Sequence, residues 1–408
     1  MDEPAGRWAA LAILSGCLLL ALAPWFSAAA VAPLIADEWN ISTLEVALLT
    51  VAVQLGFAVG ALGIAFSGAA DSIPAHRLIA VGCLVAAAAN AAFALFSTDL
   101  LTALPLRALS GAGIAAVYPV ALKVLAGWFD RRRGLAVGAM IGAITIGSAS
   151  PHAFRAAGTI LGSDWRSVVL AGSLPCLIAM VIAWIAVREG PFAAPPARLS
   201  LRMARQALAE PSVRLANLGY LGHMWELYAM WTWIPAFLAA SLALGGGVSA
   251  AGASAVAFGV VAAGGIGCVA AGALADRLGR TTLTIAAMSL SGASAVIAGL
   301  LFGAPIPLIL AVTVVWGITV VADSAQFSTA VTELAPRGTA GSALALQTAS
   351  GFLLTGITIV AVGLLDPGDR VGWSTAFALL ALGPAVGIVA MWRLRGRPEA
   401  VRMAGGRR

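Results

Sequence analysis

The sequence predicts an all-α polytopic membrane protein with twelve transmembrane helices. Of its 408 residues, 61% are hydrophobic and 10% are charged, whereas about 25% of the residues in a soluble globular domain are charged. Apolar runs of about 20 residues, the length that crosses a bilayer as a helix, follow one another along the chain. The 46 glycines favour close helix–helix contact in lipid, because small residues let backbones approach. A large soluble α-helical protein would not show such runs in succession.

Charged residues and Pro/Gly breaks mark where one span ends and the next begins. The twelve spans are expected at 8–35, 43–66, 76–97, 101–126, 134–158, 167–187, 213–241, 249–274, 281–302, 306–333, 339–365 and 373–394. The fourth and tenth spans are long enough to tilt or to protrude into water.

The longest polar connection, Arg188–Ser212, lies between the sixth and seventh spans. Its prolines and arginines indicate a linker, in which Leu199–Leu208 is expected to form a short amphipathic helix on the membrane surface. The sequence therefore predicts an N-terminal six-helix bundle, a cytoplasmic linker, a C-terminal six-helix bundle and a basic cytoplasmic tail. Their expected bounds are 1–188, 189–212, 213–395 and 396–408.

Lysine and arginine are distributed unevenly between the two sides of the membrane. If the N-terminus lies inside, nineteen of the 24 fall on the cytoplasmic side, including Arg131 and Arg198. Two, Arg166 and Arg370, fall outside, and three lie within spans. This bias predicts that both termini are cytoplasmic and that the protein is a multi-pass protein of the inner (plasma) membrane. The first apolar run is too long for a signal peptide and is expected to be retained.

The net charge of +6 is explained by these orientation signals, so no nucleic-acid partner is expected. The four cysteines lie in apolar spans without metal-like spacing and are expected to be buried thiols without a disulfide. The sequence contains no nucleotide-binding glycine loop, metal-spaced cluster or appended soluble domain. We therefore expect neither an enzyme nor a cofactor nor a metal site. The expected partners are the lipid bilayer, a small-molecule substrate and protons, and the expected state is a monomer.

An internal repeat relates the two halves of the chain. The loop after the eighth span, Gly272–Arg280, reads GALADRLGR, and the matching loop after the second span, Ser67–Arg77, reads SGAADSIPAHR. Asp71 and Asp276, the aspartates of the two loops, are 205 residues apart, about half the chain. The repeat predicts two structurally related halves.

The second loop resembles the G-x-L-A-D-R-x-G-R signature of the major facilitator superfamily of secondary transporters. The signature is complete in the second half and degenerate in the first, where Ser67 replaces its leading glycine. In the fourth span, Arg107, Gly111 and Gly113 are similar to the family's R-x-x-x-G-x-G pattern. The resemblance covers essentially the whole chain. It implies two six-helix bundles that rock about a central cavity lined by the first, fourth, seventh and tenth spans.

The two loops supply the candidate gating residues. An aspartate at a helix end beside arginines can hold one bundle against its neighbour through charge-assisted hydrogen bonds. Alternatively, Arg277 and Arg280 act only as orientation charges. The candidates are Asp71, Arg77, Gly272, Asp276, Arg277, Gly279 and Arg280.

Intramembrane polar residues concentrate on the spans that the resemblance places around the cavity. The candidates for substrate binding or proton coupling are Arg107, Tyr118, His223, Glu226, Asp323 and Gln326. The candidate cavity aromatics are Trp25, Phe26, Trp225, Tyr228 and Trp231. Trp231 also fits an interfacial belt near the outer end of its helix.

Glu226 is the leading candidate for proton coupling. It lies about 20 Å deep, near the middle of a core about 30 Å thick. Burial there disfavours its charged form, so alternating access can change its protonation. The alternative is a permanent ion pair or hydrogen bond. His223, on the adjoining turn, either shares that proton or is a satisfied core residue. Asp323 has the same two interpretations as Glu226, with Gln326 as its expected hydrogen-bonding neighbour.

Arg107 keeps its proton and is expected to need an anion, which is either the substrate or Glu226. Lys123 is expected to extend toward the inner surface near Arg131. Arg155 and His152 lie near the outer mouth of the fifth span, where they can attract anions.

These features predict a proton-coupled secondary active transporter that moves a small solute, first of all an anion, by alternating access. The first alternative is a proton-driven exporter of an amphipathic compound. The exporter-type pattern G-x-x-x-G-P-x-x-G-G is absent in that form, because the proline of Gly138–His152 comes late. The second alternative is a non-transporting membrane sensor with the same fold.

Overall fold

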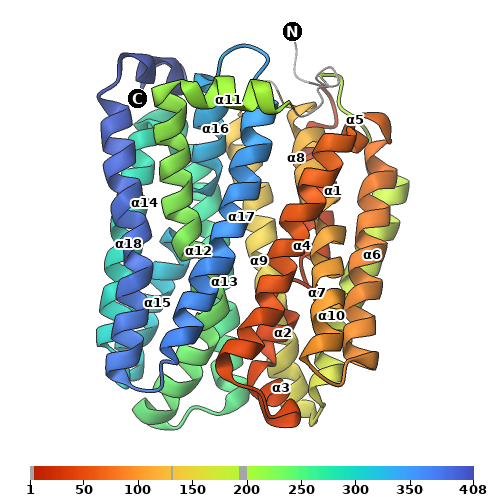
Figure 1. Ribbon diagram of the computed structural model, residues 1–408, viewed down its shortest axis with the longest axis vertical. Helices are drawn as coiled ribbons and strands as arrows, with labels where there is room; N and C mark the ends of the chain where they lie inside the picture. Colours follow the sequence, from red (N-terminus) through yellow and green to blue (C-terminus); the bar gives the residue numbers. More distant parts are fainter. Residues whose placement is uncertain (1–3, 130–131, 193–199) are drawn as a thin grey trace.

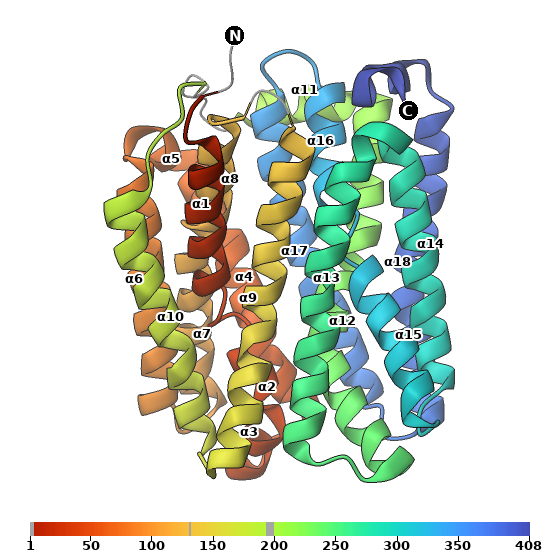
Figure 2. The ribbon, with the colours of Figure 1, turned by 180° about the vertical axis from the view of Figure 1, so that it is seen from behind.

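The structure is a computed structural model that describes residues 4–129, 132–192 and 200–408. Within these ranges the chain forms helices α1–α18 and the 3-10 helix η1, and most of the helices run along the long axis (Figure 1). The start of α1, the short helix α11 and η1 lie at one end, which we call the terminal face. The opposite end, where α3, α9 and α12 finish, is called the far face (Figures 1 and 2).

The helices of the first half pack mainly against one another. They are α1 (Arg7–Ala21), α2 (Ser27–Ala30), α3 (Ala32–Trp39), α4 (Thr43–Ser67), α5 (Ala69–Ser72), α6 (Ala75–Phe96), α7 (Leu100–Ala115), α8 (Tyr118–Ala126), α9 (Arg133–Leu161) and α10 (Trp165–Ala186).

The second half has the same character. Its elements are α12 (Pro211–Gly246), α13 (Ala250–Leu278), α14 (Arg280–Leu300), α15 (Ile306–Thr319), α16 (Ser324–Leu334), α17 (Ala340–Leu365), α18 (Arg370–Arg395) and η1 (Pro398–Gly406). Between the halves lies α11 (Leu201–Ala209), whose N-cap Ser200 accepts a hydrogen bond from the Met203 amide. The helix expected at Leu199–Leu208 is thus present. Arg131 lies outside the described residues, and so does the segment 193–199, which contains Arg198.

Eleven helical segments in the described residues are long and apolar enough to cross a membrane. Two of them combine a pair of helices, α7 with α8 and α15 with α16. The first crossing is made by the shorter α1 together with α2 and α3, which completes the twelve-helix fold. All four cysteines are buried free thiols, as expected.

The prediction of one continuous helix at 8–35 is wrong. Helix α1 ends at Ala21, and the chain passes through Pro24 before α2 begins. Proline has no backbone N–H to donate to a helix ladder, so the carbonyls around it are free for other donors. The carbonyl oxygens of Pro24 and Trp25 accept hydrogen bonds from Arg107.

The fourth and tenth spans are interrupted as well. A short break at Ala116 and Val117 separates α7 from α8, and four residues separate α15 from α16. Asp323 stands in the second break, directly before α16, without capping it by its side chain. In contrast, α12 continues through the whole seventh span, with Pro235 inside it. Three of the four spans expected around the cavity therefore contain a joint.

Two pairs of helices make the most extensive contacts between the halves, α9 with α13 and α4 with α17. The α9–α13 contact is close because glycines face backbone. A Cβ on Gly138 would lie 2.5 Å from the carbonyl oxygen of Cys268, and a Cβ on Gly272 would lie 2.5 Å from that of Gly134. A side chain at either position would force the helices apart. This glycine seam joins the halves toward the terminal face.

Candidate functional site

A cavity of about 550 Å³ lies between the two halves, toward the far face. Helices α2, α3, α4 and α9 line it from the first half, and α12, α13 and the flanks of the α17–α18 turn line it from the second. Most of its walls are alanine and other apolar side chains. Its polar and charged lining residues are Asp37, Thr43, Thr50, His152, Arg155, Thr232, Ser254 and Asp366.

Arg155 is the one cation in this lining, with His152 one turn before it on α9. His152 is buried and Arg155 is half-buried. No acceptor in the described part of the chain lies within hydrogen-bond or ion-pair distance of the Arg155 guanidinium. Asp37 and Asp366 line the same cavity but are exposed, near helix ends at the far face. The cavity wall therefore presents an unpaired positive charge.

An aromatic cluster lies directly beyond the cavity toward the terminal face. Trp25 and Phe26 meet Tyr228 and Trp231 across the halves, with ring centroids 5.8 Å apart for both Trp25–Tyr228 and Phe26–Trp231. All four side chains are buried. Four of the five expected cavity aromatics thus come together. Trp225 does not join them, since its indole N–H donates to the Leu379 carbonyl within the second half.

Several polar groups around this cluster lack partners. The indole nitrogens of Trp25 and Trp231 are buried and have no hydrogen-bond acceptor within the described ranges. The same holds for the indole nitrogen of Trp373, which lines the cavity, and for the side-chain amide of Gln54. Gln54 lies one turn from Thr50, a lining residue of α4. A buried donor without an acceptor is costly.

Arg107 does not line the cavity, and in this structure its donors have neutral partners in place of the expected anion. Its side chain is fully buried, and it donates to main-chain oxygens of Trp25 at 2.7 Å, Pro24 at 3.0 Å and Leu49 at 3.4 Å. It also donates to Ser27 at 3.0 Å and Asn90 at 3.2 Å. These neutral acceptors satisfy its donors without a carboxylate. Arg107 therefore braces the break in the first span.

Glu226 is also directed away from the cavity, into the second half. Its two carboxylate oxygens accept hydrogen bonds from the Ser291 hydroxyl at 2.5 Å and the Trp316 indole at 2.7 Å. These donors lie on α14 and α15. The geometry matches the permanent hydrogen bond that sequence reasoning kept as the alternative to proton coupling.

His223 and Asp323 form a buried pair at the break in the tenth span. His223 Nδ1 lies 2.9 Å from Asp323 Oδ1. The contact has ion-pair distance but not hydrogen-bond alignment, since Oδ1 has no hydrogen bond from the described residues. His223 Nε2 lies 2.8 Å from the Ser324 hydroxyl. His223 thus has Asp323 and Ser324 as polar partners rather than Glu226.

The two remaining candidates, Gln326 and Tyr118, lie away from the Asp323 carboxylate. Gln326 was expected beside the Asp323 carboxylate, but its side-chain oxygen accepts from Arg280 at 2.9 Å. Tyr118 stacks on Phe57 with centroids 6.2 Å apart, next to the aromatic cluster.

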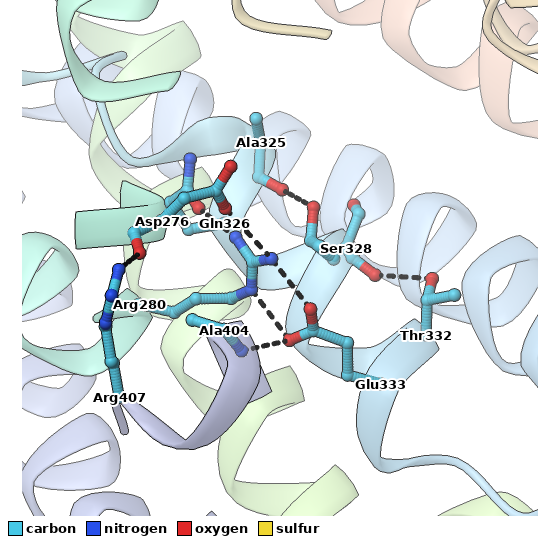
Figure 3. A network of polar contacts seen from close by, with 10 residues as sticks. Asp276, Arg280, Ala325, Gln326, Ser328, Thr332, Glu333, Ala404 and Arg407 are labelled. Carbon is cyan, nitrogen blue, oxygen red and sulfur yellow. Dashed lines mark hydrogen bonds and ion pairs between the residues drawn. The ribbon is translucent and has the colours of Figure 1, made fainter. Parts of the chain in front are cut away.

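The signature loop of the second half is the centre of a polar network at the terminal face (Figure 3). Arg280 forms two hydrogen bonds of 2.7 Å to the two oxygens of Glu333 and lies 3.6 Å from Asp276. The C-terminal tail closes this network, because the Ala404 amide donates to Glu333 and the Arg407 guanidinium donates to the Asp276 carbonyl. Sequence reasoning missed Glu333, whose only signal is a carboxylate at the end of a membrane span.

Gly279 has a conformational role in this network. Its φ of +86° lies in the left-handed region that favours glycine, and a Cβ there would lie 1.7 Å from the Arg407 carbonyl oxygen. Arg277 is exposed and has no hydrogen bond or ion pair with the rest of the described chain. The network lies within the second half, and Gly272 provides the contact with the first.

The first half has an ion pair of its own at this face. Lys123 on α8 pairs with Asp71 on α5 and donates to the Ala70 carbonyl at 2.6 Å. Lys123 was expected to extend to the surface near Arg131 and instead binds the degenerate loop. The Arg77 side chain is exposed and makes no hydrogen bond or ion pair within residues 4–129, 132–192 and 200–408.

A helical chain that crosses the membrane twelve times and encloses a cavity between related halves has the architecture of a membrane transport protein. The family model of the Major Facilitator Superfamily matches residues 14–353. The chain belongs to this superfamily, whose members among the comparisons are transporters and not enzymes.

Similar proteins include the 4-hydroxybenzoate transporter PcaK of Pseudomonas putida, which is 27% identical over 190 residues. That region is 45% of this chain and 41% of the relative, less than half of either.

Two solved structures share the fold over nearly the whole chain. A bacterial homologue of the human lysosomal transporter Spinster, inward-facing and unoccupied, is 16% identical, with 97% of this chain and 100% of that one covered and a TM-score of 0.75. The xylose transporter XylE of E. coli, partially occluded and inward open, is 14% identical, with 95% and 97% covered and a TM-score of 0.73.

Proposed function

We propose that this protein is a proton-coupled secondary transporter that moves a small organic anion across the inner membrane by alternating access. The observation that carries the proposal is the unpaired guanidinium of Arg155 on the wall of the cavity between the halves. The terminal face is taken as cytoplasmic, because nineteen of the 24 lysines and arginines belong to that side. In this orientation the cavity receives solute from outside.

The cavity offers an anion both charge and hydrogen bonds. A carboxylate matches the planar fork of Arg155, which presents paired donors. The rest of the solute then meets the aromatic cluster and the orphan indole donors of Trp25, Trp231 and Trp373. An aromatic acid with a second polar group fits this combination. The named solute of the Pseudomonas relative, 4-hydroxybenzoate, has this chemistry and is the first compound to test.

Passage to the other side requires the cross-half contacts to separate. The aromatic cluster lies next to the cavity on the side of the terminal face. The glycine seam of Gly138 and Gly272 lies between the cluster and that face and holds the two halves together there. The Arg280–Glu333 and Lys123–Asp71 pairs hold loops within each half and can keep each half rigid as it rocks. In this mechanism the signature loop stabilises one facing state.

The His223–Asp323 pair is the best-placed coupling element. It is buried, and it stands at the joint between α15 and α16. A proton on His223 places a cation beside the Asp323 carboxylate, whereas a proton on Asp323 removes that attraction. Proton transfer can therefore change the strength of the contact between α12, which carries His223, and the break that contains Asp323. Glu226 already has two donors and is the second candidate.

The test is uptake into proteoliposomes with an imposed pH gradient, for 4-hydroxybenzoate and a panel of benzoates, aliphatic acids and neutral analogues. Hydrogen bonds to charged groups contribute about 1.5–3 kcal/mol, and half-exposure of Arg155 reduces this. We therefore expect Arg155→Gln to raise the KM for the anion about tenfold. Arg155→Lys should retain part of the affinity.

Arg370→Gln is the matched control, because it removes the same charge from an exposed arginine near the far face that donates to the Leu300 carbonyl. Its KM should remain that of the wild type. Transport of neutral analogues with no response to Arg155→Gln would refute the anion proposal. Accumulation that ignores the pH gradient would refute proton coupling.

A further inference from the structure

A groove runs along the outside of the second half, between α12 and α18, where these helices approach the terminal face. It consists of two adjoining hollows of about 650 and 380 Å³, which share Leu215, Leu218 and Arg393 as lining residues. The first hollow adds Pro211, Arg214, Gly396 and Arg397, and the second adds Ala385, Val386, Val389 and Ala390. The groove is separate from the solute cavity and from the polar network of the signature loop.

The end of the groove at the terminal face is cationic. The side chains of Arg214 and Arg393 are exposed and have no hydrogen bond or ion pair with any other described residue. The buried Nε atom of Arg397 lies 3.8 Å from Glu399 Oε2, which is an ion-pair distance, and it has no hydrogen bond in the described chain. Glu399 also accepts from Ser212 at 3.0 Å. Of these three guanidinium groups, only that of Arg397 pairs with a carboxylate in the described chain.

The remainder of the groove is apolar and faces outward. Leu218, Val386 and Val389 are 44%, 56% and 48% exposed. Val386 lies seven residues before Arg393, so it is about 10 Å deeper along α18. A side chain that is exposed at this depth in a membrane-spanning helix is covered by acyl chains. The cationic end and the apolar remainder thus match the two parts of one lipid molecule.

We propose that this groove binds an anionic phospholipid of the leaflet at the terminal face. The phosphate lies among Arg214, Arg393 and Arg397, because guanidinium groups bind phosphate oxygens in paired, charge-assisted hydrogen bonds. One acyl chain packs along Leu218, Val386 and Val389. Orientation signals alone explain arginines at this face, but they do not require three of them to line one hollow that continues into an apolar groove.

The test uses the full-length protein, depleted of lipid, in native mass spectrometry and in titrations with phosphatidylglycerol and phosphatidylcholine of identical acyl chains. Each basic residue at a membrane surface contributes roughly fivefold in affinity for acidic lipid. The wild type should therefore prefer phosphatidylglycerol by tenfold or more, and the variant R214Q/R393Q/R397Q should lose that preference.

The matched control is R202Q/R205Q/R337Q, which removes the same charge from exposed positions at the terminal face and should retain the preference. Because the first triple variant can fail to fold, V386W provides a second test. It fills the groove without changing charge and should weaken binding of both lipids. Equal preference in the two triple variants would overturn the proposal, as would unchanged binding in V386W. Competition by millimolar inorganic phosphate would overturn it in favour of a free-phosphate site.

Discussion

Replacing Arg107 tests whether this arginine is a structural brace or a contact for the solute. In Arg107→Met the five hydrogen bonds of the guanidinium are lost. The Pro24 carbonyl keeps a bond from Ser27, and Ser27 keeps its bond to Asn90. The Trp25 carbonyl has no other hydrogen bond from the described residues. It is the acceptor that the substitution leaves unsatisfied.

The expected loss of stability follows from this count. One buried orphan acceptor costs about 1–3 kcal/mol, and the bonds whose acceptors keep another partner add about 1 kcal/mol. The total is about 2–4 kcal/mol. With an unfolding entropy of about 2.1 cal/mol/K per residue, roughly 0.9 kcal/mol/K for the whole chain, the apparent Tm should fall by about 2–5 °C.

The assay is thermal unfolding of the purified protein, combined with the uptake measurement. Arg107→Lys should lower the Tm by less and leave the KM for the anion unchanged. Arg77→Met, at an exposed arginine, should leave both unchanged. The reasoning is refuted if Arg107→Met is as stable as the wild type. It is also refuted if Arg107→Lys raises the KM tenfold without a change in Tm.

Four further substitutions and one control test the coupling element and the terminal face. Asp323→Asn should abolish accumulation driven by a pH gradient while solute exchange continues. Glu226→Gln should mainly lower the Tm, because it loses one of two hydrogen bonds, worth about 1–2 kcal/mol. Loss of accumulation in the Glu226 variant alone would reverse this assignment. Gly272→Leu inserts a side chain into the glycine seam, and an overpacking cost of about 1–3 kcal/mol should favour the state open at the terminal face. Cysteine labelling from the cytoplasmic side measures this, and unchanged labelling would count against the seam. Gly279→Ala should release the C-terminal tail and expose it to protease, whereas Gly338→Ala, with a similar positive φ of +80° and no neighbour within 4 Å, should leave the tail protected. A protected tail in both variants would contradict the role of the loop.

The fold could be predicted from the sequence because each span is defined by local length and polarity. The breaks could not, since their signals are weak. Pro24 stands in an apolar run that is long enough for one helix. The break before Asp323 depends on contacts with α12 and α13 that only the folded chain creates. The aromatic cluster was foreseen in part, because Trp25, Phe26, Tyr228 and Trp231 lie on spans that the resemblance places together.

The candidate site was predicted less well, for one physical reason. From the sequence, a buried charge is expected to have an opposite charge as its partner, but backbone carbonyls freed at a helix break can also be its partners. Arg107 therefore lies among neutral oxygens, and the unpaired cation in the cavity wall is Arg155 instead. Glu333 was missed because a carboxylate near a helix end has no distinctive pattern. The partner of Arg280 becomes visible only when α16 and the signature loop are side by side (Figure 3).

The unbroken course of α12 has a practical consequence for spectroscopy. Three of the four spans that the resemblance places around the cavity have joints, at Pro24, at Ala116 and at Asp323, where they can bend locally. The remaining one, the seventh span, is a single helical rod from Pro211 to Gly246. A spin label or fluorophore on this rod reports displacement of the whole half-molecule, whereas a label beyond a joint reports only its own segment. One pair of probes on α12 and a second pair beyond a joint would therefore distinguish rocking of the halves from local bending in the same molecule.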